Sequence, residues 1–298
     1  AYDISLGLVG SEMCIRDSRR RSGGGRRYDR PHTQSIRGVS MINLKTTREL
    51  RYMRDAGKIS QEALLKAGEA VRPGVSTLEL DKIVRRTIEK AGAVPSFLGY
   101  GGFPASACIS VNNVVIHGIP SAHEILKEGD IVSIDVGAIY EGFNGDNAWT
   151  FPCGKVSEEA QKLMDATRES LFLAIEKAVP GNRIGDIGSA VQQYVEARNY
   201  SVVREFVGHG VGAKLHEDPS VPNYGTPGRG VRLLPGMTIA IEPMVTQGSC
   251  EVKILKDGWT TVTKDGKLAA HFEHSIAITP DGPVTVSYTH LRAHETEA

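Results

Sequence analysis

The alternation of hydrophobic and polar residues has two periods, which predict four helices and a set of short strands. The helices carry apolar residues three or four positions apart and are expected to begin near residues 46, 76, 157 and 184. The first two begin at capping-box sequences, TTRE and STLE. Apolar runs predict a hairpin over 129–151 and strands over residues 107–116, 200–207, 237–242, 253–262 and 271–279.

The hairpin over 129–151, GDIVSIDVGAIYEGFNGDNAWTF, contains two acids among apolar residues. A two-residue turn at 141–142 places Asp135 opposite Ala148, and Asp146 lies two residues from Ala148 on the same face. Two buried carboxylates this close are costly unless a cation or a shared proton lies between them. The hairpin therefore predicts a metal site, and the alternative is a pair of acids that faces solvent.

The second half of the chain repeats the first at one constant offset in sequence number. The offset that relates Gly74 to Gly181 also relates the acid Asp135 to Glu242, and it superimposes two helical stripes. This repeat predicts two similar αβ halves around one sheet, with a ligand site at their joint. The alternative is a chance alignment of two unrelated helix–strand units.

Three further residues look like metal ligands: His209 in a Gly-rich loop, Glu242 at the end of an apolar strand, and Glu273 within another. Together with the hairpin acids they form a set of four carboxylates and one imidazole, which favours Mn(II), Fe(II) or Co(II). So many charges suit two divalent cations, which catalyse hydrolysis of amides or phosphate esters. His117 and His216 could contact substrate or transfer protons, the alternative being surface or packing histidines.

Composition and charge exclude several other classes. No apolar run approaches the roughly 18 residues that span a membrane, and no secretory signal is expected. The four cysteines lack the spacing of a disulfide framework, so we expect a reducing, cytoplasmic compartment. Residues 41–284 carry 26 basic and 29 acidic residues, which gives no electrostatic basis for nucleic-acid binding.

The two ends of the chain are related through their coding sequence. A back-translation of residues 5–18, read as its reverse complement, translates as residues 285–298. We therefore expect both segments to be translated sequencing adapter outside the fold. Residues 1–40 as a whole are expected to be non-native or disordered, with Met41 as the natural start; a basic nucleic-acid-binding arm is the alternative for the Arg/Gly-rich part.

Six segments together resemble the signature blocks of type I methionine aminopeptidases in their short bacterial form: NNVVIHGIP, SIDVG, NGDNAWTF, GHGVGAKLHEDP, AIEPMV and HFEHS. The resemblance implies a single metallopeptidase domain over 41–284 with the pita-bread fold. That fold is an α+β architecture of two pseudo-symmetric αβ halves around a curved antiparallel sheet. The implied enzyme is a cytoplasmic monomer that removes the initiator methionine from nascent proteins with a small second residue, with the ribosome as a further candidate partner.

The resemblance also implies a role for each candidate ligand. Asp135 would hold one of two divalent ions (Co, Mn or Fe(II)), and Asp146 and Glu273 would bridge both. His209 and Glu242 would complete the shell of the other ion. Glu242 would in addition accept a proton during hydrolysis.

Two histidines and an apolar pocket are implied as the substrate-binding part of the site. His117 and His216 would orient the scissile amide and stabilise charge on its oxygen. The pocket residues are expected to enclose the methionine side chain: Phe97, Tyr100, Phe103, Cys108, Leu215 and Trp259.

Two alternative functions share this resemblance. A proline-directed aminopeptidase or dipeptidase has the same ligands but an extra N-terminal domain, for which residues 41–284 leave no room. A non-catalytic peptide- or ribosome-binding relative would lack some of the five ligands. The type II enzymes are not expected, because the segment between His216 and Glu242 is too short for their helical insertion.

Overall fold

The structure is a computed structural model that describes residues 42–287. The expectations for residues 1–41 and 288–298, including most of the predicted adapter segments, lie outside this described part. Within 42–287, no helix is both long enough and apolar enough to cross a membrane.

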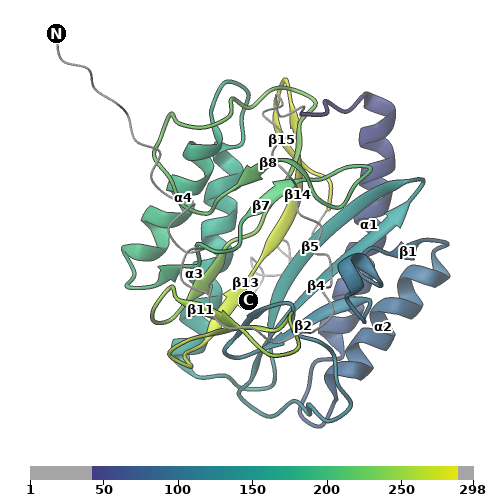
Figure 1. Cartoon of the computed structure of the whole chain (residues 1–298), viewed down its shortest axis with the longest axis vertical. Coiled ribbons are helices and arrows are strands. Elements are labelled where there is room, and N and C mark those ends of the chain that lie inside the picture. Colours follow the sequence, from purple (N-terminus) through teal and green to yellow (C-terminus); the bar gives the residue numbers. More distant parts are fainter. Residues whose placement is uncertain (1–41, 288–298) are drawn as a thin grey trace, which may run out of the picture. The chain divides into compact units, whose positions relative to one another are not determined.

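The four predicted helices are confirmed (Figure 1). They are α1 (Thr47–Glu69), α2 (Thr77–Lys90), α3 (Glu158–Lys177) and α4 (Ile184–Glu196), and a short 3-10 turn, η1, covers Tyr100–Gly102. Both predicted capping boxes form. The Glu49 N–H donates to the Thr46 hydroxyl at 3.3 Å, and the Thr46 N–H donates to the Glu49 carboxylate at 2.7 Å.

The strands form one large and two small antiparallel sheets. The large sheet has the order β1-β4-β5-β14-β9-β7-β8, with β2 beside β4 and β15 beside β14. Its strands are β1 (Val94–Pro95), β2 (Ala107–Val111), β4 (Ile131–Tyr140), β5 (Phe143–Pro152), β7 (Gly208–Gly210), β8 (Glu217–Val221), β9 (Thr238–Ile241), β14 (Glu273–Thr279) and β15 (Gly282–Thr285). The small sheets contain β6 (Ser201–Val202), β10 (Met244–Thr246) and β13 (Ala269–His271), and β3 (Val114–Ile116), β11 (Val252–Ile254) and β12 (Thr261–Thr263).

Three predicted strands are interrupted in the structure, and the run 200–207 retains only the short β6. The run 107–116 turns at Asn112, whose φ of 55° ends β2 before β3 begins. The run 253–262 is the β11–β12 hairpin, and β13 and β14 are separate strands on either side of Phe272. Strands β1, β7, β8, β10 and β15 were not predicted, because two to five residues are too few to display a period.

The predicted register of the β4–β5 hairpin is confirmed. Asp135 lies opposite Ala148, and the two-residue turn 141–142 has positive φ at both positions, as a type I′ turn requires. Helix α1 lies against this hairpin at very short range. A Cβ added to Gly145 would lie 2.3 Å from the backbone nitrogen of Gly57, so only glycine allows this approach beside Asp146.

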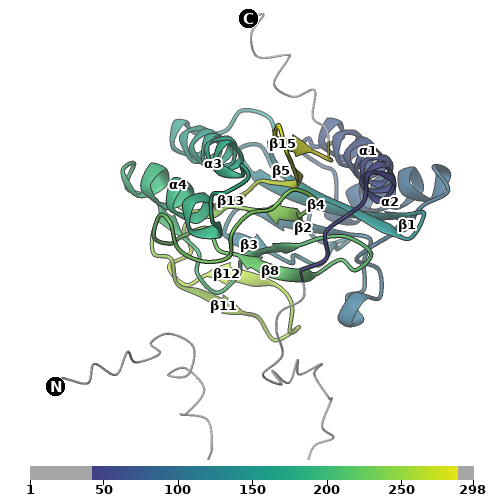
Figure 2. The ribbon, with the colours of Figure 1, turned by 90° about the horizontal axis from the view of Figure 1, so that it is seen from above.

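The predicted sequence repeat is a structural pseudo-symmetry. The Gly74 N–H donates to the Leu126 carbonyl at 2.8 Å, and the equivalent Gly181 N–H donates to the equivalent Leu233 carbonyl at 3.1 Å. Helices α1 and α2 match α3 and α4, and all four lie on one side of the molecule, with the β11–β12 hairpin on the other (Figure 2). The two halves join where β5 pairs with β14.

The fold continues beyond residue 284. Strand β15 ends at Thr285, and Val286 is buried against Met53 and Ala277. Ser287 is also buried, and its hydroxyl accepts a hydrogen bond from the Ser275 N–H at 3.1 Å. Residues 285–287 therefore take part in the packing of the domain, although they belong to the segment that the coding-sequence relation singled out.

Candidate active site

The structure brings all thirteen candidate residues together around one cavity of about 630 Å³, open to solvent, where the two halves join. They are Phe97, Tyr100, Phe103, Cys108, His117, Asp135, Asp146, His209, Leu215, His216, Glu242, Trp259 and Glu273. Residues that are far apart in sequence are thus neighbours here, and their geometry decides what the site can do.

The sheet register places several of these side chains in one row. Cys108, Asp135, Ala148 and Glu273 lie directly opposite one another on β2, β4, β5 and β14. Asp146 lies two residues from Ala148 on β5, so its side chain shares this face. Three carboxylates thus converge at the joint, two from the first half of the chain and one from the second.

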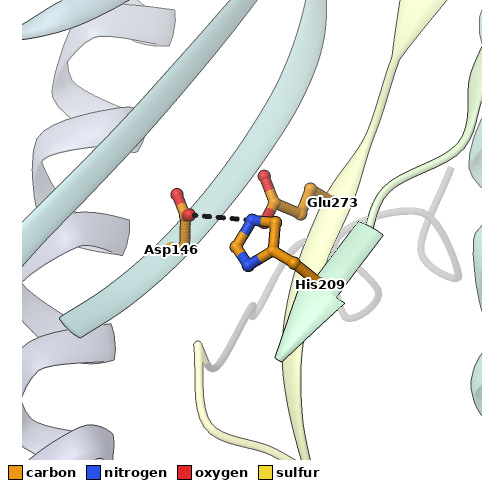
Figure 3. A group of neighbouring side chains, drawn as sticks. All are labelled: Asp146, His209 and Glu273. Atoms are coloured by element: carbon orange, nitrogen blue, oxygen red, sulfur yellow. Dashed lines mark ion pairs between the residues drawn. The ribbon is translucent and has the colours of Figure 1, made fainter. Parts of the chain in front are cut away.

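His209 completes this group from β7, which is separated from β14 by β9 in the sheet order (Figure 3). Ligand atoms of Asp146, His209 and Glu273 all lie within 4.8 Å of one another. The His209 Nε2 atom is 3.9 Å from Asp146 Oδ2 and 3.5 Å from Glu242 Oε1. Its Nδ1–H donates to the Gly210 carbonyl at 2.8 Å, which leaves Nε2 as the lone-pair atom directed at the acids.

The prediction of a Gly-rich loop around His209 is wrong in one respect: His209 lies on strand β7. Its glycine neighbours allow other backbone segments to pass close by. A Cβ on Gly208 would lie 2.4 Å from the Ala240 carbonyl oxygen, and one on Gly210 would lie 2.3 Å from the Asp218 carbonyl oxygen. The two glycines therefore allow the close backbone packing that places His209 in the sheet, facing the acids.

The residues fit a site for divalent cations. Asp135 Oδ1, Asp146 Oδ1 and Glu273 Oε1 are buried without a hydrogen-bond partner among the described residues. Buried carboxylate oxygens without partners are unfavourable, and cations would satisfy them. When bound, paired divalent cations polarise a carbonyl group and activate a water molecule for hydrolysis.

Burial controls the protonation of the site. Burial, with the charge of neighbouring acids, raises the pKa of Asp135, Glu242 and Glu273 well above the usual carboxyl range. Burial also raises the pKa of Asp146 to about 7, and it lowers the pKa of His209 to about 4. The imidazole is thus neutral and able to bind a metal ion at pH 7, whereas burial disfavours the ionised form of each acid, which a bound cation would stabilise.

We therefore expect Mn²⁺ binding at pH 7 to release protons, because burial raises the pKa of Asp146 to about 7 and that of Asp135 well above its usual range. Affinity should increase as the pH rises, since fewer protons then have to be displaced. Calorimetric titration in two buffers with different ionisation enthalpies measures this release. Equal binding heats in both buffers would contradict the prediction.

The two candidate catalytic histidines line the cavity beside the metal-ligand cluster. His117 follows β3 with a φ of 58°, a conformation strained for any residue except glycine. Its ring packs edge-on against Trp259. A hydrogen bond of 2.8 Å joins Nδ1 of His216 to the Tyr100 hydroxyl. Burial lowers the pKa of both rings, that of His117 to about 4, so each is neutral at pH 7.

The apolar residues form a compact pocket beside the metal-ligand cluster. Phe97, Phe103, Cys108 and Leu215 are buried together, and Trp259 packs edge-on against Phe103 with 5.2 Å between ring centroids. Burial raises the pKa of the Cys108 thiol well above its usual range, so it remains a neutral, polarizable wall. The pocket suits a flexible apolar side chain.

Sequence reasoning missed a buried ion pair next to the segment that carries Leu215 and His216. Lys45 Nζ lies 2.6 Å from Glu217 Oε2, and the two side chains are only 5% and 7% exposed. The other Glu217 oxygen accepts from the Lys214 N–H at 3.1 Å. The segment before α1 is thereby tied to the loop that carries His216. The partners are 172 residues apart, so no local pattern could have indicated this pair.

Replacing Lys45 with Met should destabilise the protein by about 3 kcal/mol, because Glu217 would remain buried without its partner. Urea denaturation of the metal-free protein measures the change. Lys66→Met is the matched control, since Lys66 pairs with Glu62 on the exposed face of α1 and should cost less than about 1 kcal/mol. Equal losses in both variants would contradict the prediction.

A second residue that was missed is His271, buried beside Glu242. It lies two positions before Glu273, so the same-face argument that joined Asp146 to Asp135 could have been applied to it. Burial, with a smaller effect of His117, lowers the pKa of His271 to about 3.

A pseudo-symmetric αβ fold with four carboxylates and an imidazole at its central joint is suited to metal-dependent hydrolysis. The sequence model of Metallopeptidase family M24 matches residues 51–280, and the chain belongs to this family. Within it, the relatives at high identity are methionine aminopeptidases. That of Clostridium perfringens is 59% identical over 243 residues, covering 82% of this chain and 97% of the relative. Methionine aminopeptidase 1 of Bacillus subtilis is 54% identical over 242 residues, covering 81% and 97%.

Solved structures support the same assignment. The methionine aminopeptidase of Thermotoga maritima has a TM-score of 0.82 at 46% identity and covers 84% of this chain and 100% of its own. The prolidase of Pyrococcus furiosus has a TM-score of 0.67 at 24% identity, covers 83% of this chain and 65% of its own, and shows a shared fold alone. The predicted pita-bread fold, with its curved antiparallel sheet, is confirmed.

Proposed function

We propose that this chain is a methionine aminopeptidase that uses two divalent ions to remove the initiator methionine from nascent proteins with a small second residue. One observation carries the proposal: the complete ligand set, with unpartnered buried oxygens, adjoins an apolar pocket. The names of relatives at 54% and 59% identity support it.

Five residues would hold the two ions. Asp135 would bind one ion and Asp146 and Glu273 would lie between both, in keeping with their convergence from β4, β5 and β14. His209 and Glu242, whose ligand atoms are 3.5 Å apart, would bind the other ion. A set dominated by carboxylates suits Co(II), Mn(II) or Fe(II).

The remaining side chains would bind the substrate and move protons. Glu242 would accept a proton, since burial, with the charges of Asp135 and Asp146, raises the pKa of its carboxyl well above the usual range and makes the carboxylate a stronger base. His117 and His216, both neutral, would donate hydrogen bonds to the scissile amide. The pocket around Phe103 and Trp259 would hold the methionine side chain through dispersion and sulfur–aromatic contacts.

Cleavage of short peptides tests this function. The chain loaded with Co(II), Mn(II) or Fe(II) should release methionine from Met-Ala-Ser, and much less from Met-Phe-Ser. It should leave Leu-Ala-Ser and Ala-Pro substrates intact. Metal analysis should give about two ions per active chain. Preferential cleavage before proline would support the proline-directed alternative, and peptide binding without cleavage would support a non-catalytic relative.

We also propose that the enzyme acts as a monomer in the cytoplasm, where nascent chains emerge, with the ribosome as a candidate partner. Co-sedimentation with ribosomes tests this contact. We further propose, on the strength of their reverse-complement relation, that residues 5–18 and 285–298 are translated adapter, of which residues 285–287 nevertheless pack against the domain. Resequencing the gene from primers outside both ends tests that origin.

A further inference from the structure

One buried side chain beside the site has no role in the proposed reaction. His271 is the last residue of β13 and is 2% exposed. Its Nε2 atom finds no hydrogen-bond partner among residues 42–287. A buried ring nitrogen without a partner is unfavourable, so its presence here calls for an explanation.

The unpartnered atom is directed at the proposed base. His271 Nε2 is 3.8 Å from Glu242 Oε2, whereas the other carboxylate oxygen, Oε1, is 3.5 Å from His209 Nε2. The Glu242 carboxylate therefore lies between two imidazole rings, one beside each oxygen. The separation between His271 and Glu242 is too long for a hydrogen bond, but such contacts in ligand-free sites often shorten when substrate binds.

The main chain on both sides of this contact is fixed. The His271 N–H donates to the Thr150 hydroxyl at 3.1 Å, and that hydroxyl donates back to the His271 carbonyl at 2.8 Å. The Glu242 carbonyl accepts from the Asn223 side chain at 2.9 Å. With both main-chain segments held, rotation of the two side chains can bring His271 Nε2 and Glu242 Oε2 together. A supporting residue on a fixed backbone can hold a catalytic side chain in its productive geometry.

We propose that His271 is a positioning residue for Glu242, whose Oε2 accepts a hydrogen bond from the His271 Nε2–H. This contact fixes the plane of the carboxylate, so that Oε1 is presented to the reacting groups. The proposal rests on the proposed function, in which Glu242 accepts the proton. The opposite tautomer would place a lone pair of Nε2 against the carboxylate oxygen, which is repulsive unless a cation lies between them.

Two substitutions separate positioning from packing. His271→Leu fills similar space without a donor, and His271→Gln restores an N–H at similar reach. We expect His271→Leu to lower kcat about 10- to 100-fold on Met-Ala-Ser, with KM and metal content unchanged. His271→Gln should remain within about threefold of the wild-type kcat, since it keeps the donor. Equal losses in both variants, or no loss in His271→Leu, would overturn the proposal.

Loss of bound metal in His271→Leu would also overturn it, because His271 would then be a ligand. A measurement without substrate keeps this test separate from the proposed function. In the protein loaded with Zn²⁺, a diamagnetic ion that keeps the Glu242 carboxyl ionised, nitrogen-15 NMR of the imidazole groups should show the His271 signals, identified by their loss in His271→Gln, as the Nε2–H tautomer. The Nδ1–H tautomer would contradict positioning even if the wild-type chain cleaved no peptide.

Discussion

Asp146→Asn and Glu273→Gln should each lower kcat on Met-Ala-Ser by roughly 10³-fold or more, the equivalent of about 4 kcal/mol of transition-state stabilisation. Both carboxylates are buried at the joint between the halves, and their ligand atoms lie within 4.8 Å of each other and of His209. An amide of the same shape removes a negative charge and presents an N–H group on one side. The pair of cations would then lose its shared ligand.

Steady-state kinetics and metal analysis together test this prediction. Each variant should bind fewer than two ions per chain while its far-ultraviolet circular dichroism remains that of the wild type. Glu89→Gln is the control, since this carboxylate pairs with Arg85 on the exposed face of α2. Turnover close to that of the wild type in either site variant would rule out a two-metal mechanism.

His216→Ala and His117→Ala should each lower kcat about 100-fold while both metal ions remain bound. Neither ring is among the five proposed ligands, yet both line the cavity beside them. His216 is held by Tyr100 through the 2.8 Å hydrogen bond, and His117 by its packing against Trp259. Removal of either ring would therefore remove a placed hydrogen-bond donor.

The control for these two variants is a histidine that lies away from the site. His123 is exposed on a loop and does not line the cavity, so His123→Ala should leave kcat unchanged. KM should change little in the two site variants if they act in the transition state. Loss of metal from either would assign that histidine to the ligand shell instead.

The elements that were predicted best from sequence are those whose pattern lies in residues close together in the chain. The β4–β5 register follows from apolar strands on either side of a two-residue turn, and so the convergence of Asp135 and Asp146 was predictable. The repeat placed Glu242 near Asp135 across the joint without any knowledge of the sheet order. Buried charge was the strongest guide, because four carboxylates in apolar strands need a shared explanation.

Features that depend on distant contacts could not be predicted. The Lys45–Glu217 pair joins segments 172 residues apart, and strands such as β7 owe their existence to neighbours rather than to their own sequence. The opposition of Ala148 and Glu273 required the order of β5 and β14, which sequence did not supply. The burial of Val286, beyond the predicted domain boundary at residue 284, likewise depends on contacts with residues distant in sequence.

The joint between β5 and β14 makes metal binding conditional on assembly of the two halves. The first half supplies Asp135 and Asp146, and the second supplies the other three proposed ligands. Cleavage of the connection 153–157, between β5 and α3, would separate two incomplete sites. Neither fragment would contain all five proposed ligands, and only their association would bring the full set together, so the connection 153–157 is the place to divide the chain for a split reporter of protein association.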